Sequence, residues 1–355
     1  MVGSAVTLLL LSVVAGTVRL GVRTDTGRAF AMRVIEGLKV GRLGRLHVEG
    51  LQGDLFGSFS VRRLSIRDER GDWIRASNLS VTWSPLELST RRVHVQRVRA
   101  EVIQVLRRPI QTPPSGPSRP LSVSVAIDEL RTRLETLPAF SSALGVWDVS
   151  GQADFPNGGT VTARLDAQSR IHAGDGLRLA LRREPEGRLL MQADAVEATG
   201  GALAGSIGLP ADQRLFVRGR VDGYIDGEGR LSVVAESGNI RPVTATGAWG
   251  PNGATLDARF LLGASSLTAD YAARVGPEAT VRLRAAPLRE GVYRVEGTAL
   301  ARDAQVALSG PVDWRRRRAE GVNLRVAVAA LERWVGAVQA GPTRFNGVLT
   351  GAPDR

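Results

Sequence analysis

Apolar and polar residues alternate over most of the chain after residue 45, and this two-residue period constrains the fold more than any other feature. In one such run, Leu79, Val81 and Trp83 are separated by single polar residues. Successive side chains of a β-strand point to opposite faces, so each run predicts a strand with one apolar and one polar face. Turn signals such as Asp226-Gly227-Glu228-Gly229 recur roughly every ten to fifteen residues, as in antiparallel meanders.

The number of these runs limits how the strands can be arranged. On the order of twenty strands cannot close into one small barrel, because twisted open sheets rarely exceed about ten strands without splitting or flattening. The alternatives are β-sandwiches and one long sheet whose apolar face lines a groove. Aromatic residues make up only 5% of the chain, which favours the groove, since sandwich cores usually carry bulky aromatic residues. The sequence therefore predicts an all-β fold, an elongated, curved antiparallel β-sheet that forms a taco-like hydrophobic groove, with a few short helices.

The first 18 residues carry no charge and are rich in leucine and valine. As a helix they would cover about 27 Å, close to the thickness of a bilayer core. We expect a signal-anchor transmembrane helix over 1–20; the alternative is a cleaved signal peptide, for which Ala15-Gly16-Thr17 is a poor cleavage site. Basic residues follow the run but do not precede it, which by the positive-inside rule would place the body in the cytoplasm. A natural start with a few more basic residues would remove this conflict.

The rest of the chain divides by pattern. Helical spacing of apolar residues predicts a juxtamembrane amphipathic helix and turn over 21–45, with a cap helix on the following sheet as the alternative. We expect a first β-groove segment over 46–108, a proline-rich linker or loop over 109–120, and continuing β-groove repeats with short helices over 121–355. The short helices are expected at 197–210, where a loose crossover is the alternative, and at 329–340. A final strand at 343–350 leaves the sheet unfinished, so we expect a truncated chain.

The chain lacks the residues that most enzymes and metal sites need. It has no cysteine and three widely separated histidines, and it contains none of the common nucleotide-binding, hydrolase or zinc-protease motifs. His94 alternates with Val93 and Val95, which predicts a solvated histidine on the polar face of a strand. We therefore expect no catalytic residue, cofactor or metal. A β-helix enzyme acting on polysaccharides is a remote alternative. Such an enzyme needs clustered carboxylates, and the sequence does not indicate where they would lie.

The chain is basic, with 47 Lys and Arg against 35 Asp and Glu and a net charge of +12. The arginines are spread over almost every segment, and the one dense run, Arg315–Arg318, fits a solvated strand edge. A scattered excess of positive charge favours solubility rather than specific binding. Nucleic acid is therefore not an expected partner.

An ordered series of short motifs extends from residue 26 to residue 109. It comprises Thr26-Gly27-Arg28, Val48-Glu49-Gly50-Leu51-Gln52-Gly53, Leu64-Ser65-Ile66-Arg67-Asp68, Gly71-Asp72-Trp73, Trp83-Ser84-Pro85 and Arg107-Arg108-Pro109. In this order the series resembles the N-terminal region of the TamB family, the inner-membrane subunits of the bacterial translocation and assembly module, within the wider AsmA-like group. A fainter likeness continues at 184–187 and 201–210, so the resemblance covers roughly the first two thirds of the chain.

The resemblance implies a single-pass inner-membrane protein of a Gram-negative bacterium, with its body in the periplasm and a β-groove that bridges toward the outer membrane. It also implies phospholipids as cargo and an outer-membrane β-barrel partner of the TamA type. This chain departs from the family in two respects, since no basic residues precede the anchor and no C-terminal domain for that partner follows. Partner binding by this chain is therefore less firmly implied than lipid transport.

The function expected from the sequence is a non-enzymatic conduit for phospholipids through a hydrophobic groove. Transport of this kind needs a continuous apolar surface and no catalytic group, because each methylene removed from water contributes roughly 0.8 kcal/mol. The predicted groove lining is Leu64, Ile66, Leu79, Val81, Trp83, Val93 and Val95. The alternative is a structural assembly factor for outer-membrane β-barrel proteins, acting with a TamA-type partner in protein secretion, which would bind clients by β-strand addition at free sheet edges.

Overall fold

The computed structural model describes residues 40, 42–54, 57–110, 124–198, 201–334 and 341–352. The chain forms two compact units. Unit 1 comprises the residues up to Pro185 together with Val196–Ser206, and unit 2 comprises Glu186–Ala195 and the residues from Ile207 onward. The described residues are mostly strand, with a few short helices, so the predicted all-β class is confirmed.

Unit 1 is built on strands β1 to β8. Their bounds are β1 Arg45–Gly53, β2 Ser58–Asp68, β3 Gly71–Ser84, β4 Arg92–Val105, β5 Ser124–Thr136, β6 Gly145–Phe155, β7 Val161–Ser169 and β8 Gly176–Arg183. Three short helices join or follow them, η1 Pro85–Thr90, α3 Pro138–Ser141 and α4 Ala202–Ser206. The predicted short helix within 197–210 is thus confirmed as α4.

Neighbouring strands of unit 1 pair in chain order, and the predicted antiparallel arrangement holds for every pair but one. The exception is β4 with β5, which pair in parallel from Arg92 opposite Ser124 to Val105 opposite Thr136. A parallel pair needs a long crossover because the chain must return to the same end of the sheet. The chain makes that connection between Val105 and Ser124, a stretch that includes the whole of the predicted linker over 109–120, of which only 109 and 110 are described.

The core of unit 1 lies on the apolar face of β1 to β5. Residues such as Phe59, Trp73, Trp83 and Phe140 are buried there with aliphatic side chains from all five strands. The aromatic residues of the chain are few, yet several of them are packed into this one core. A low aromatic content of the whole chain is therefore compatible with a closed core in this unit.

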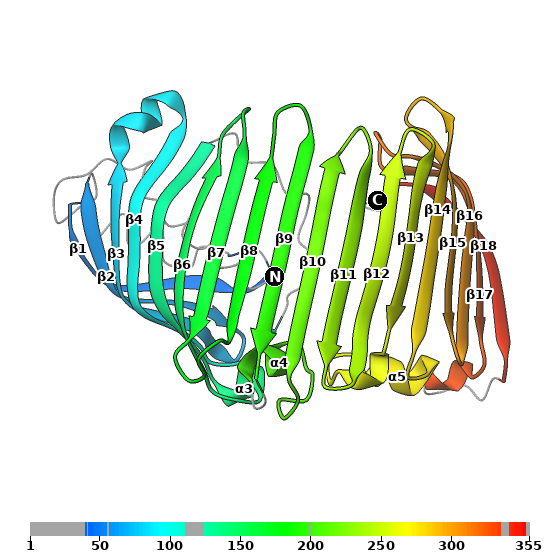
Figure 1. Cartoon of the computed structure of the whole chain (residues 1–355), viewed down its shortest axis with the longest axis horizontal. Coiled ribbons are helices and arrows are strands. Elements are labelled where there is room, and N and C mark those ends of the chain that lie inside the picture. The colour runs from blue at the N-terminus through cyan, green and yellow to red at the C-terminus, as the bar shows by residue number, and fades with distance from the viewer. Residues whose placement is uncertain are drawn as a thin grey trace. The chain divides into compact units, whose positions relative to one another are not determined.

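Unit 2 is an open antiparallel sheet in which each strand from β10 to β18 pairs with the next in the chain (Figure 1). Its strands are β9 Arg188–Glu197, β10 Leu215–Tyr224, β11 Gly229–Ser237, β12 Ile240–Gly250, β13 Gly253–Phe260, β14 Ala279–Arg289, β15 Val292–Ala301, β16 Ala304–Asp313, β17 Arg318–Val328 and β18 Thr343–Gly351. Short helical segments η2 Leu262–Ala264 and α5 Ala269–Val275 connect β13 to β14, and η3 Leu331–Arg333 follows β17. The predicted meander is confirmed within this unit.

One alternating run was wrong as a strand prediction. Residues 267–273 belong to the alternating runs of the sequence, with Leu267, Ala269 and Tyr271 separated by Thr268 and Asp270, and so predict a strand, but the structure has helix α5 at Ala269–Val275. The segment contains three alanines, which favour helix, and Gly276 follows with a φ of 109° while its N–H donates to the carbonyl of Ala272. An alternation over so few residues cannot by itself distinguish a strand from two helical turns.

Several sequence predictions lie outside the described residues. They are the transmembrane helix over 1–20, nearly all of the amphipathic segment over 21–45, and the second half of the helix expected at 329–340. The first half of the helix expected at 329–340 contains only the short helix η3. Within the described part of the chain, no helix combines the length and apolarity needed to cross a bilayer.

Candidate functional site

The two faces of the unit 2 sheet differ sharply in chemistry. On β14, Val281 and Leu283 are half-buried on one face, while Arg282 and Arg284 are exposed on the other. The same alternation recurs on β10, β11 and β13. Each strand therefore contributes an aliphatic side and a polar side to the unit, as the two-residue period of the sequence predicts.

The strand register aligns the apolar sides into continuous rows across the sheet. The central row is Val221, Leu231, Gly247, Leu256, Leu283, Gly297, Leu308, Leu324 and Gly347. The row beside it is Gly219, Val233, Ala245, Ala258, Val281, Ala299, Val306, Val326 and Phe345. Neither row contains a charged or polar side chain. At about 4.8 Å per strand, each row extends roughly 38 Å from β10 to β18. We call the surface formed by these two rows the apolar face.

Glycine recurs in every third strand of the central row, at Gly247, Gly297 and Gly347. The missing side chain at Gly297 is replaced by its neighbours, because a Cβ placed there would lie 2.6 Å from Leu283 and 3.0 Å from Leu308. Leucine methyl groups from both sides therefore cover the glycine backbone. The result is a low aliphatic surface in which the same leucine–glycine–leucine arrangement repeats along the row.

The opposite face of unit 2 is polar. Arg282 pairs with Asp257 across β13 and β14 at 3.5 Å, and Arg259 pairs with Glu278. Arg218 and Asp194 form another pair at 3.3 Å. Charged residues are thus confined to one side of the sheet, which leaves the apolar face without a charge.

Little covers the apolar face within the described part of unit 2. The only extensive contacts there, apart from those between neighbouring strands, are between α5 and η2. Helix α5 lies at the ends of the strands rather than across them (Figure 1). The residues of the central row other than Gly297, which its leucine neighbours bury, are accordingly half-buried rather than buried.

The seven residues predicted to line a groove lie elsewhere, in the core of unit 1. They share one packed cluster and have between 0 and 4% of their surface exposed. Val81, for example, lies between Phe59 and Val98 on the neighbouring strands. A lipid chain would reach these side chains only if the packed core opened, so their role as a lining stays a prediction. The half-buried aliphatic residues of unit 2 fit such a role better, because they already form a surface.

Three of the short motifs, at 64–68, 71–73 and 107–109, contribute residues to one hydrogen-bonded site in unit 1. Asp68 accepts hydrogen bonds from the Arg107 guanidinium at 2.6 and 2.8 Å and from the backbone N–H of Ile110 at 2.7 Å. Arg107 also donates to the carbonyl of Gly71, and Arg108 donates to the last carbonyls of α4. The Arg107 hydrogen bonds hold the pKa of the Asp68 carboxyl well below its usual range. We call this set the polar latch; it fastens the crossover after β4 to the β2–β3 turn.

His94 is held more firmly than a solvated histidine. Its Nδ1 lies 2.6 Å from Glu87 of η1 and its Nε2 lies 2.8 Å from Asp128 of β5. Hydrogen bonding to Glu87 is the main reason that the pKa of His94 is raised, and Asp128 adds to it. Both ring nitrogens are occupied by carboxylates, so this histidine is not placed to act as a general base.

The His94 contacts predict a pH dependence of stability in unit 1. A raised pKa means that the stabilisation is complete below the unfolded-state value near 6.5 and is lost as pH rises through the folded-state pKa. We expect the free energy of unfolding to fall by up to about 1 kcal/mol between pH 6 and pH 9, a small change because the carboxylates are partly exposed. Urea unfolding at both pH values would measure it, and His94→Asn should abolish the difference. An equal pH dependence in that variant would contradict the assignment.

No group of three or more His, Asp and Glu side chains among the described residues is arranged to hold a metal ion. The buried carboxylate of Glu197 accepts the backbone N–H groups of Leu203 and Ala204 at 2.7 Å each, while burial raises its pKa. It thus caps α4 and has a structural role. The apolar face is the feature of the described chain whose chemistry most needs a functional explanation.

Comparison with known proteins gives no further guide. No protein-family model matches the chain, and no curated protein or solved structure is significantly similar to it. The function must therefore be argued from the residues and their arrangement.

Proposed function

We propose that this chain is a non-enzymatic conduit that binds the acyl chains of phospholipids on the apolar face of unit 2. The observation that carries the proposal is the alignment of uncharged aliphatic and glycine residues into two rows from β10 to β18. A soluble monomer rarely leaves a contiguous apolar surface of this size uncovered unless it binds something. The polar opposite face is consistent with one wet side and one lipid-binding side.

Energetics favour an acyl chain as the occupant. Each methylene removed from water contributes about 0.8 kcal/mol when fully buried, and a chain lying on one open face would gain part of that value. A row of roughly 38 Å exceeds the length of one leaflet, since a bilayer core is about 30 Å thick. An extended acyl chain would therefore find an apolar partner over its whole length.

The repeated glycine positions favour movement along the row rather than capture at one point. Gly247 and Gly297 place a similar leucine-flanked surface three strands apart, so an acyl chain would have nearly equal energies in these two positions. The absence of a charge in either row removes the main barrier between those positions. Curvature of the sheet would turn this face into the groove expected from the sequence.

The proposal extends to location and partners on the basis of sequence alone. The apolar run over 1–18 and the resemblance to the TamB family support an inner-membrane anchor and a periplasmic body. They also support transfer of lipid toward the outer membrane, with a TamA-type β-barrel as a partner. These parts of the proposal depend on segments outside the described residues.

Equilibrium binding of an acyl-labelled fluorescent phospholipid to the purified full chain tests the proposal. We expect saturable binding that unlabelled phospholipid displaces and that a soluble head-group analogue without acyl chains does not. Absence of binding by a folded chain would contradict the conduit. Capture of unfolded outer-membrane β-barrel segments without lipid would favour the assembly-factor alternative.

A further inference from the structure

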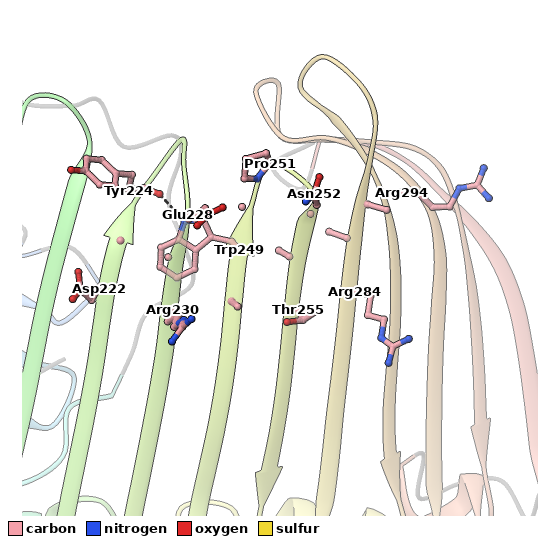
Figure 2. A pocket seen from close by; sticks show the side chains of 18 of the residues that line it. Asp222, Tyr224, Glu228, Arg230, Trp249, Pro251, Asn252, Thr255, Arg284 and Arg294 are labelled. Carbon is pink, nitrogen blue, oxygen red and sulfur yellow. Dashed lines mark hydrogen bonds between the residues drawn. The ribbon is translucent and has the colours of Figure 1, made fainter.

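The polar face of unit 2 contains a depression at the end of the sheet opposite α5, beside the β10–β11 and β12–β13 turns (Figure 2). The volume of this depression is about 1270 Å³, and it is open to solvent. This is more than the roughly 300–1,000 Å³ typical of small-molecule pockets, so it suits an extended polar ligand. Asp222, Arg230 and Arg284 line it from the face opposite the apolar rows. The depression is therefore a site separate from the acyl-binding surface.

The register explains why the surface is hollow there. Arg230 of β11 lies opposite Ala248, Ala248 lies opposite Thr255, and Thr255 lies opposite Arg284 of β14. Two small side chains thus separate two arginines whose strands are about 14 Å apart. Towards the turns, further small residues line the depression beside Tyr224, Trp249 and Pro251. The small residues that line the floor are Ala248, Gly250, Gly253, Thr255 and Ala286.

Arg230 and Arg284 of the depression are not paired with the carboxylates on the facing strands. Arg284 lies opposite Glu296 and Arg230 lies opposite Asp222, yet no ion pair within 4 Å joins either couple. Asp222 is instead 4.0 Å from Arg188. A nearby pair across β13 and β14, Arg282 with Asp257, does form.

Arg294 at the rim likewise has no carboxylate among the described residues within 4 Å, and Figure 2 shows its side chain and that of Arg284 extended from the sheet. Guanidinium groups bind phosphate oxygens through paired hydrogen bonds, which makes arginine the preferred residue for such ligands. Glu228 and Glu296 also line the depression, so a ligand with hydroxyl or ammonium groups beside its phosphate fits better than a uniform polyanion.

We propose that this depression binds a phosphate-bearing ligand between Arg230 and Arg284, with Arg294 as a further cation at the rim. The exposed arginine side chains would turn toward the phosphate, and the small floor residues leave room for the attached polar group. The phosphate can belong to a soluble organophosphate or to a phospholipid head group presented at a membrane surface. The site does not depend on acyl binding by the apolar face.

The experiment uses the full chain and two probes, glycerol 3-phosphate in solution and vesicles of phosphatidylcholine with phosphatidylglycerol. Binding is measured by calorimetry for the soluble probe and by co-sedimentation for the vesicles. The test variant is Arg230→Gln with Arg284→Gln. The control is Arg325→Gln with Arg344→Gln, which removes the same charge from the same face outside the depression. Thermal unfolding checks that both variants fold.

We expect the test variant to weaken binding of at least one probe by about tenfold or more, and the control to leave it within about twofold. Loss for glycerol 3-phosphate would identify a soluble organophosphate as the source of the phosphate. Loss for vesicles alone would identify a lipid head group. If both variants weakened binding equally, the effect would come from the change in net charge alone, and the proposal would be overturned. Failure of the unmodified chain to bind either probe at millimolar concentration would also overturn it.

Discussion

Replacing Arg107 by alanine should destabilise unit 1 by about 3 kcal/mol. The substitution leaves the Asp68 carboxylate, whose side chain is only 1% exposed, without its guanidinium partner, and breaking a buried ion pair on one side typically costs about 3–5 kcal/mol. We expect the lower end because Asp68 keeps the N–H groups of Ile110 and Arg70. Urea unfolding at pH 7, with hydrogen exchange of β2 and β3 as the local probe, measures the loss.

Two further variants distinguish the polar latch from a general effect of charge. Arg107→Lys keeps the charge but cannot span Asp68 and the Gly71 carbonyl with one planar group, so an intermediate loss is expected. Arg131→Ala removes an exposed arginine whose pairing with Glu129 should contribute less than about 1 kcal/mol. If Arg107→Ala and Arg131→Ala had equal effects, the latch would not stabilise the unit.

The second large effect is expected from a charge at the centre of the apolar face. Leu283→Asp should weaken phospholipid binding on the order of a hundredfold, because placing an aspartate against acyl chains costs about 2.5–3.5 kcal/mol. Folding should be nearly unaffected, since Leu283 is half-buried on an open face rather than packed in a closed core. Titration with the acyl-labelled phospholipid and thermal unfolding measure the two quantities separately.

Thr298→Asp is the matched control for that variant. Thr298 lies on the next strand, opposite Arg282, on the polar face, so the added carboxylate would meet a cation and water. Lipid binding should then stay within about twofold of the unmodified chain. A comparable loss in both variants would mean that the two faces do not differ in function.

The two-residue period was sufficient to predict much of the fold. It identified most strands of both units, including those that carry Leu231, Leu256 and Leu283, because sustained alternation has few explanations other than a half-buried strand. It failed at 267–273, where the run was short and rich in alanine. It could not reveal the parallel pairing of β4 with β5, since pairing direction depends on where the crossover leads the chain and not on the pattern within either strand.

The type of candidate site could be predicted from the sequence, but the residues that form it could not. The sequence indicated an apolar sheet face, yet the residues chosen for it, such as Val81 and Trp83, are buried in the core of unit 1. Alternation looks the same whether the apolar side of a strand is covered or open, because covering depends on how the sheet packs. The rows that include Gly247 and Gly297 required the register, which no single strand contains. The polar latch likewise joins residues about forty positions apart, and no local pattern around Asp68 or Arg107 indicated that they pair.

Photo-cross-linking in cells that carry labelled phospholipid would show directly whether lipid binds on the apolar face of unit 2. A benzophenone amino acid would replace Leu283 in one variant of the full chain and Arg282 in another, so that adjacent residues probe opposite faces of β14. If lipid binds on the apolar face, lipid adducts are expected at position 283 and none above background at position 282. Equal labelling at both positions, or labelling at neither in a folded chain, would contradict lipid binding on the apolar face.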